Sequence, residues 1–384
     1  MALRRQTLHT IVFLGIANHT VLAGSRVAVL LDALGRGASA ATVGVLTALY
    51  ALFPMLLAVA VGRICDRKGV RQPMIVACVV VGVGAILPCT DPGLVALFAS
   101  AALVGAGFMV FQVATQHSAG VLGEVPERPR NFSLLAMGYS ISGFVGPLVA
   151  GFGIDHAGYP ATFALFALLP VVVLAVLWRA PLALPGPHPE ALATGHGNPI
   201  DLLRHRALRR AFLVNVMFAI GWDLHMIFIP IYGARIGLSA SEIGIVLAAF
   251  AAATFAVRIA VPWIGRRWSE PQVLSLALLV TGVVFLAFPL AGSLRALLPL
   301  SVVLGLALGS GQPLVMSLLH RCAPAGRTGE AAGLRMSLVQ SMAVAVPLAF
   351  GALVVSVGIG PVFWFVGGAL VAGGWWARPG RDDG

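Results

Sequence analysis

The sequence predicts an all-α membrane protein whose twelve transmembrane helices form two similar six-helix bundles. Composition, the length of the apolar runs and an internal repeat all point to this class. Hydrophobic residues make up 59% of the 384 residues and charged residues only 10%, with a mean hydropathy of +0.95. A soluble domain of this length needs a more charged surface. A hydrocarbon layer of about 30 Å takes about 20 apolar residues per helix, and such runs fill most of the chain.

Twelve spans can be drawn, with boundaries that hold to within a few residues. We expect them at 8–33, 41–61, 74–90, 94–117, 132–154, 161–179, 211–233, 241–262, 272–291, 296–319, 331–356 and 360–377. The segment 181–210 interrupts this pattern, because it is rich in proline and glycine and then carries a basic cluster. We therefore expect an N-terminal bundle at 1–180, a cytoplasmic linker at 181–210 and a C-terminal bundle at 211–384.

The formal charge of +11 is explained by where the basic residues lie. With the N-terminus inside, 19 Lys and Arg fall in cytoplasmic segments and three in outer loops, while Arg26, Arg258 and Arg335 fall inside spans. The positive-inside rule then places both termini in the cytoplasm. One Lys against 24 Arg indicates a GC-rich, bacterial genome. We expect a multi-pass protein in the lipid bilayer of a bacterial cytoplasmic (inner) membrane, with no nucleic-acid partner.

Neither a metal centre nor an enzyme active site is expected. Cys65, Cys78, Cys89 and Cys322 lack metal-ligand spacing and imply no disulfide framework. The 14 acidic residues are scattered, and no HExxH motif or nucleotide-binding loop is present. The sequence therefore predicts no cofactor, no bound metal and no enzymatic activity.

The two halves of the chain match at an offset of 200 residues. The segment 37–44 reads GASAATVG and the segment 237–244 reads GLSASEIG, each at the start of a span. Ser39 and Ser239 are expected N-caps, and Ser239 with Glu242 has the spacing of a capping box. The same shift pairs several single residues: Arg67 with Arg267, Gly105 with Gly305, Gln112 with Gln312, and Pro147 with Pro347. A parallel duplication of six spans is typical of one transporter architecture.

The loop after the second span carries a recognisable motif. The chain reads GRICDRKGVR over 62–71, and its Gly62, Asp66, Arg67, Gly69 and Arg71 follow the pattern Gly, three residues, Asp-Arg, one residue, Gly and then basic residues. This resembles the signature loop of the major facilitator superfamily. The resemblance implies a secondary transporter that works by alternating access and is a monomer by default.

The resemblance also implies a role for this loop as a latch that joins the two halves while the cavity faces outward. Gly62 is expected to allow close helix packing and Gly69 a sharp turn. Asp66 is expected near Glu330, at the start of span eleven, where the helix dipole favours a carboxylate. The alternative is that the basic residues of the loop serve only as positive-inside charges.

A second motif concerns the direction of transport. Span five carries Gly138, Gly143, Gly146, Pro147 and Gly151, which resembles the antiporter signature of drug:proton antiporters in this superfamily. This likeness implies efflux, whereas ordinary packing of small residues is the alternative. Span four lacks the Arg that those exporters use for proton coupling, so coupling here would need another group.

Coupling residues are expected on spans one and seven, which the resemblance places beside the central cavity. Arg26 and Asp223 lie at similar depths under the 200-residue shift, and we expect them to form an ion pair across the halves during the cycle. Asp223 is then the candidate proton carrier. The alternative is that Arg26 snorkels outward and Asp223 caps a local kink. His19 and His225 are further candidates because imidazole titrates near neutral pH.

Candidate substrate-binding groups share polar or aromatic character on the cavity spans: Asn18, Gln112, Gln116, Asn215, Gln312 and Trp222. Interhelical hydrogen bonding is the alternative for the amides. Two functions are open at this point. One is proton-coupled efflux of an amphipathic or drug-like compound. The other is uptake or exchange of a small organic anion or metabolite, with Arg26 as its charge partner.

Overall fold

The computed structural model describes residues 2–90, 93–122, 128–180, 182–186, 199–264, 267–322 and 328–378 and is almost entirely α-helical. In this described part, eleven helices are long and apolar enough to cross a membrane, so the chain is a multi-pass membrane protein. These helices are α1 (Ala2–Gly35), α2 (Ala40–Lys68), α3 (Arg71–Thr90), α4 (Leu94–Val121), α5 (Arg128–Arg179), α6 (Arg206–Arg235), α7 (Ala240–Ile264), α8 (Glu270–Ala287), α9 (Leu294–Cys322), α10 (Thr328–Val357) and α11 (Ile359–Trp376). Two short 3-10 helices, η3 (Pro199–Arg204) and η4 (Phe288–Leu290), accompany them.

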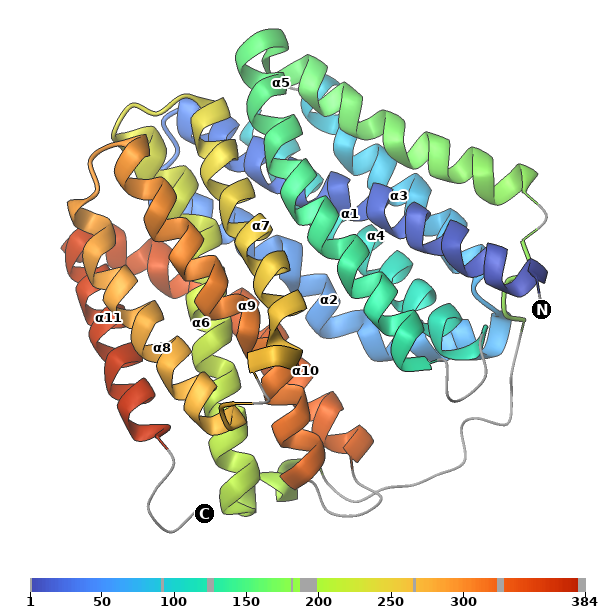
Figure 1. Cartoon of the computed structure of the whole chain (residues 1–384). Helices are drawn as coiled ribbons and strands as arrows, with labels where there is room; N and C mark the ends of the chain where they lie inside the picture. Colours follow the sequence, from blue (N-terminus) through green and yellow to red (C-terminus); the bar gives the residue numbers. More distant parts are fainter. Residues whose placement is uncertain are drawn as a thin grey trace. The chain divides into compact units, whose positions relative to one another are not determined.

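Helix α5 accounts for the difference between twelve expected spans and eleven helices. It runs for 52 residues, and its backbone leaves helical geometry at Gly158, where φ is 80° and ψ is 171°. An L-residue with a side chain rarely adopts this conformation, which explains the glycine. Figure 1 shows α5 folding back on itself. The two arms of α5 are therefore the fifth and sixth spans.

The chain divides into two compact units. Unit 1 comprises 1–38, 46–195 and 239–248, and unit 2 comprises 39–45, 196–238 and 249–384. The division lies close to the expected linker, with one difference. Residues 39–45, which include the start of α2, pack with unit 2. Residues 239–248, which include the start of α7, pack with unit 1. Each unit thus includes a short segment from the opposite half of the sequence.

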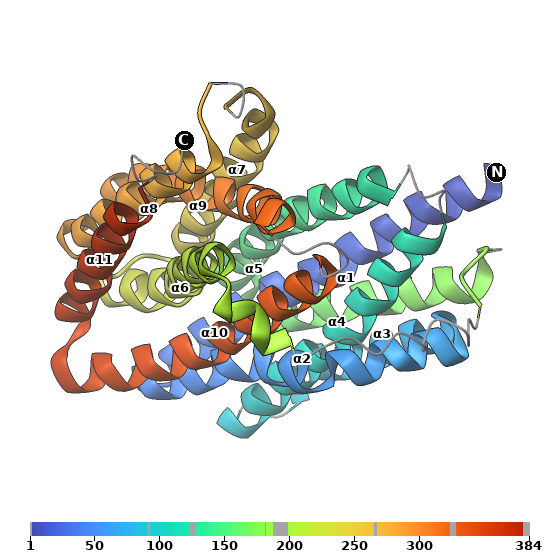
Figure 2. The same cartoon turned by 90° about the horizontal axis from the view of Figure 1, so that it is seen from below.

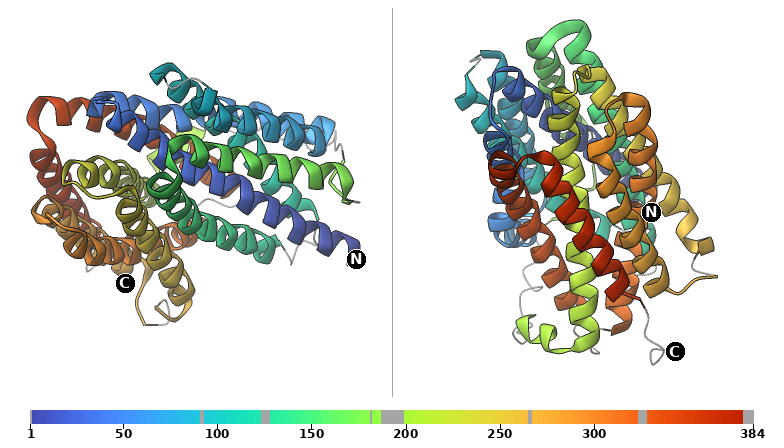
Figure 3. Two further views of the ribbon diagram at one scale, coloured as in Figure 1. Left: turned by 90° about the horizontal axis from the view of Figure 1, so that it is seen from above. Right: turned by 90° about the vertical axis from the view of Figure 1, so that its left-hand side faces the viewer.

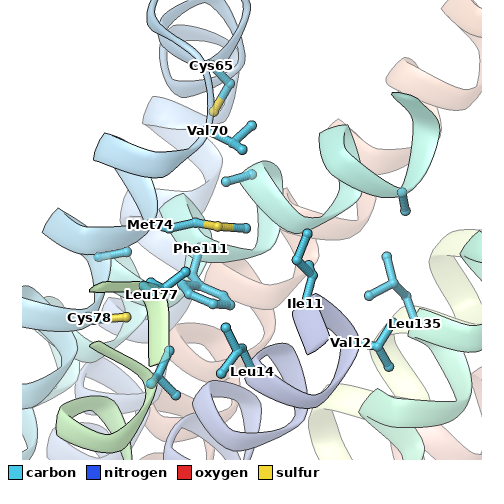
Figure 4. Packing of buried hydrophobic residues seen from close by; sticks show 14 of the residues in the cluster. Ile11, Val12, Leu14, Cys65, Val70, Met74, Cys78, Phe111, Leu135 and Leu177 are labelled. Carbon is cyan, nitrogen blue, oxygen red and sulfur yellow. The ribbon is translucent and has the colours of Figure 1, made fainter. Parts of the chain in front are cut away.

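Unit 1 is built around α1. This helix lies beside α5, and α3 packs on both α4 and α5 (Figures 1 and 3). Figure 4 shows part of the resulting core, where Leu14 of α1, Met74 of α3, Phe111 of α4 and Leu177 of α5 converge. Since lipid tails are as apolar as these side chains, close van der Waals packing rather than exclusion of water holds the helices together.

Unit 2 has a core rich in phenylalanine. Helix α8 lies beside α9 and α11 (Figure 2), and α6 packs on α9 and α10. The rings of Phe228 and Phe363 have centroids 3.8 Å apart, and Phe285 lies 5.4 Å from Phe363. Aromatic pairs at such distances add to the packing energy beyond their buried area.

The backbone confirms the repeat found in the sequence. Gly37 and Gly237 both have positive φ, 77° and 81°, and so do Gly158 and Gly358, 80° and 84°. Helices α2 and α7 begin at Ala40 and Ala240, again 200 residues apart. The predicted capping box is also present, because the backbone N–H of Glu242 donates to Ser239 Oγ at 3.2 Å and the N–H of Ser239 donates to Glu242 Oε2 at 2.8 Å.

Close helix contacts follow the same repeat. A Cβ added at Gly105 would lie 2.5 Å from the carbonyl oxygen of Tyr50, and one added at Gly305 would lie 2.4 Å from that of Phe250. The sequence match between Gly105 and Gly305 therefore reflects equivalent packing in the two units, where only a missing side chain allows backbones this close.

Tryptophans mark the ends of several helices that are predicted to lie at the cytoplasmic surface. Exposed tryptophans stand at the ends of α5, α7 and α11 (Trp178, Trp263, Trp375 and Trp376), and Trp268 lies between α7 and α8. The guanidinium of Arg378 lies 3.8 Å from the ring centroid of Trp375. Tryptophan with a neighbouring basic residue is typical of the membrane–water interface.

Candidate functional site

The membrane-embedded part of unit 1 contains a cluster of aromatic and hydroxyl side chains from three helices. His19 of α1 lies with its ring centroid 5.1 Å from Phe108 of α4 and 4.9 Å from Tyr139 of α5. His19 Nδ1 is 2.5 Å from Ser142 Oγ, and the Tyr139 hydroxyl is 3.2 Å from Thr115 Oγ1. We call these five residues the His19 cluster. It offers flat apolar rings beside hydrogen-bonding groups.

Ser142 connects His19 to the backbone of α5. Its hydroxyl oxygen lies 2.5 Å from His19 Nδ1 and within 3.2 and 3.1 Å of the carbonyl oxygens of Gly138 and Tyr139. The direction of the hydrogen bond between His19 and Ser142 depends on the tautomer of the imidazole.

The other sequence candidates of unit 1 differ in their surroundings. Arg26, Gln112 and Gln116 are half-buried on α1 and α4. Asn18 is fully buried, and its amide nitrogen lies 3.5 Å from the Leu14 carbonyl oxygen and 3.8 Å from Cys78 Sγ of α3. That position fits hydrogen bonding within and between helices, the alternative given for this residue.

In unit 2, α6 carries three neighbouring candidates. Asp223 is buried, with 8% of its surface exposed. The half-buried Trp222 lies with its ring centroid 4.9 Å from Phe250. His225 is fully buried between Phe250 and Phe288, at centroid distances of 4.3 and 5.8 Å. Neither ring nitrogen of His225 has a hydrogen-bond partner within the described part of the chain.

Two arginines of unit 2 lie inside the predicted spans, each beside a carboxamide. Arg258 Nη2 of α7 donates to Gln312 Oε1 of α9 at 3.1 Å. Arg335 Nη1 of α10 donates to Asn215 Oδ1 of α6 at 3.4 Å. Sequence reasoning placed both arginines in spans without a role. A charged side chain inside a membrane is energetically costly, and this cost could have identified both arginines as functional candidates from the sequence.

The predicted outer end of unit 1 holds two carboxylates. Asp32 makes a bidentate ion pair with Arg36, at 2.7 and 3.0 Å. Asp155 of α5 accepts hydrogen bonds from the backbone N–H groups of Ala240 and Ser241, at 3.2 and 2.7 Å. A carboxylate at the first turn of α7 satisfies N–H groups that the helix leaves open.

Comparison with known families identifies the protein's class. The family model of the Major Facilitator Superfamily matches residues 9–341 and matches again over 211–383. The chain belongs to the major facilitator superfamily. It is a membrane transporter rather than an enzyme, and the second match covers the C-terminal copy of the repeat.

This major facilitator superfamily member also resembles solved structures of the POT family. A POT family transporter in complex with 5-aminolevulinic acid aligns with a TM-score of 0.81 at 14% identity, over 97% of this chain and 95% of that chain. One in complex with a thioalcohol conjugated peptide gives 0.80 at 14%, over 97% and 95%. A peptide transporter POT in complex with sulfate gives 0.78 at 17%, over 97% and 93%. At these identities the likeness shows the fold alone.

The superfamily's signature loop is only partly as expected. Gly69 has a φ of 76°, which confirms the sharp turn. A Cβ at Gly62 would meet no described atom within 4 Å, so the expected close packing at Gly62 stays a prediction. Arg71 Nη2 donates to the Leu177 carbonyl oxygen at 2.9 Å. The side chains of Asp66 and Glu330 lie outside the described residues.

The glycines of span five pack closely with α1 and α7. A Cβ at Gly146 would lie 2.8 Å from Ala23 Cβ, and one at Gly138 would lie 2.8 Å from Ile16 Cγ1. A Cβ at Gly151 would lie 2.4 Å from the Ala240 carbonyl oxygen. These contacts explain the small residues by packing, and packing is compatible with either direction of transport.

Proposed function

We propose that the protein is a proton-coupled secondary transporter that exports a small amphipathic or drug-like molecule by alternating access. The His19 cluster is the observation that carries this proposal. Its two aromatic rings present apolar faces, while His19, Ser142 and Thr115 supply hydrogen-bonding groups beside them. Ligand sites commonly combine mostly apolar walls with a few fixed polar groups.

Asp223 is the proposed proton carrier. Two carboxylates are buried among the residues whose burial is described, Asp32 and Asp223. Asp32 pairs with Arg36 at the end of α1, whereas Asp223 lies in the middle of α6, within a predicted span, where a titrating acid suits proton transfer across the membrane. His225 is less suited because a charged imidazole would lie buried against the rings of Phe250 and Phe288.

Liposomes that contain the purified protein and a pH-sensitive dye test this function. Amphipathic dyes and drugs are added under a proton gradient, and we expect substrate movement together with proton flux. Asp223→Asn should abolish gradient-driven accumulation yet retain substrate exchange at equal pH, because only coupling is lost. Asp201→Asn, at the exposed helix η3, is the control. Full accumulation by Asp223→Asn would contradict the assignment.

The charge of Arg26 supports a second candidate function, uptake or exchange of a small organic anion. Arg26 lies half-buried within α1, where a fixed positive charge favours an anionic partner. Arg26→Gln should then abolish anion transport. An ion pair of Arg26 with Asp223 during the cycle remains part of the proposal, and a charge-swapped double variant that regains activity would support it.

The loop latch and the topology complete the proposal. We propose that Asp66 and the basic residues of the loop 62–71 stabilise the outward-facing state, in a monomer with both termini in the cytoplasm of a bacterial cell. Asp66→Asn should then raise labelling of positions accessible only from the cytoplasmic side. Reporter fusions at both ends of the chain test the topology.

A further inference from the structure

The contact between α6 and α10 in unit 2 contains buried hydrogen-bond donors for which the described residues supply no acceptor. Arg335 Nη1 donates to Asn215 Oδ1 at 3.4 Å, a long hydrogen bond. Asn215 is 4% exposed. Its amide nitrogen Nδ2 and the Nε of Arg335 are both buried, and neither has a hydrogen-bond partner among the described residues. One guanidinium and one carboxamide thus keep two buried donors available.

The position of this pair makes the open donors costly. Asn215 lies nine residues after the first residue of α6, about 14 Å along the helix, and Arg335 is the second residue of the apolar span 334–357. Both donor atoms are closed to water, and a buried donor that lacks an acceptor loses its hydration without compensation. An arginine inside a membrane usually marks a functional group.

The geometry of the donors indicates what kind of ligand would satisfy them. A guanidinium presents Nε and Nη donors in a planar fork that matches the two oxygens of a carboxylate or the oxygens of a phosphate. The Asn215 amide adds a neutral donor beside the fork, and its own oxygen already faces Arg335. An oxyanion would therefore satisfy both donors and neutralise the arginine.

We propose that Arg335 and Asn215 form an oxyanion-binding site that takes the carboxylate or phosphate group of the transported molecule. This inference rests on the proposed function as a small-molecule transporter, and it narrows the substrate to an amphipathic anion. The site is distinct from the candidate residue Arg26, which lies in unit 1.

Binding to the detergent-purified protein tests the site without any transport. Benzoate and inorganic phosphate are compared with benzamide, which has the shape of benzoate and no charge, by thermal shift and calorimetry. We expect stabilisation by the anions and none by benzamide. Arg335→Gln should weaken anion binding at least tenfold, whereas Arg235→Gln, at the exposed end of α6, should leave it unchanged. Equal effects of the two variants would overturn the proposal.

A second variant tests the proposed site even when the anion that it binds has not been identified. Asn215→Asp places a carboxylate at the oxyanion position beside Arg335, so it should raise the melting temperature and abolish the effect of added anions. Unaltered stability in Asn215→Asp, or an undiminished effect of added anions in that variant, would overturn the site.

The last comparison separates a substrate group from a lipid headgroup. Nanodiscs of phosphatidylglycerol and of phosphatidylcholine are compared for the native protein and Arg335→Gln. We expect the stability difference between the two lipids to be the same in both proteins. A difference that disappears in Arg335→Gln would assign the site to an anionic lipid and overturn its assignment to the substrate. Intact anion binding without transport would instead contradict only the proposed function.

Discussion

The contact between α5 and the start of α7 depends on two glycines, and substituting them tests the packing directly. A Cβ at Gly244 would lie 2.5 Å from the Pro147 carbonyl oxygen, and one at Gly151 would lie 2.4 Å from that of Ala240. Ordinary contact begins at 3.4 Å, so an alanine requires the backbones to separate by about 1 Å, an overpacking that costs about 1–3 kcal/mol. The better helix propensity of alanine returns up to about 1 kcal/mol.

We therefore expect Gly244→Ala and Gly151→Ala to lose roughly 1–2 kcal/mol each. For a unit of this size the loss corresponds to a melting temperature lower by roughly 2–8 °C. Thermal unfolding of the purified protein in detergent measures this change, with Gly368→Ala as the control, because a Cβ there would meet no described atom within 4 Å. The control should be neutral or slightly stabilised.

The repeat supplies an independent check. A Cβ at Gly44 would lie 2.4 Å from the Pro347 carbonyl oxygen, the equivalent contact in unit 2. Gly44→Ala should therefore destabilise the protein as Gly244→Ala does. Native stability in both variants, or an equal loss in Gly368→Ala, would refute the reasoning that these glycines exist to allow close backbone contact.

Three further substitutions follow from single contacts. Asp155→Ala removes two hydrogen bonds to the start of α7 and should cost about 0.5–1 kcal/mol, since solvent screens this exposed carboxylate; a melting temperature unchanged from the native protein would contradict it. His225→Phe should gain about 1 kcal/mol, because two buried nitrogens without partners disappear, and loss of proton-coupled transport would show instead that His225 carries protons. Gly69→Ala forces an alanine to a φ of 76° and should lower the melting temperature by more than Gly62→Ala does.

The fold could be predicted from the sequence because its main signals are local. Apolar runs set the helices, and the 200-residue repeat in segments such as GASAATVG and GLSASEIG reappears in the positive φ angles of Gly37 and Gly237. The turn at Gly158 joins two expected spans into one helix, because glycine and the following residues reverse the chain without a loop. The sequence predicted the break between 154 and 161, but no pattern in it shows that the chain reverses there without a loop.

The candidate site was less accessible to sequence reasoning, because its partners come from different helices. The position of His19 in the sequence does not show that Ser142 and Tyr139, over a hundred residues away, lie beside it. Arg335 was visible as a charge within a span, but its neighbour Asn215 becomes evident only when α6 and α10 pack together. The motif of the loop 62–71 led to the expectation of a close contact at Gly62. A sequence motif does not show in which conformational state such a contact forms.

Alternating access is the central claim, and distances measured between spin labels test it most directly. Labels at Ala157 and Leu290 report on the predicted outer side, and labels at Trp178 and Trp375 on the predicted inner side; all four positions are exposed. On changing from alkaline to acidic buffer in liposomes, we expect the two distances to change in opposite directions, and the change to vanish in Asp223→Asn. Distances that stay constant, or that lengthen together, would contradict the account.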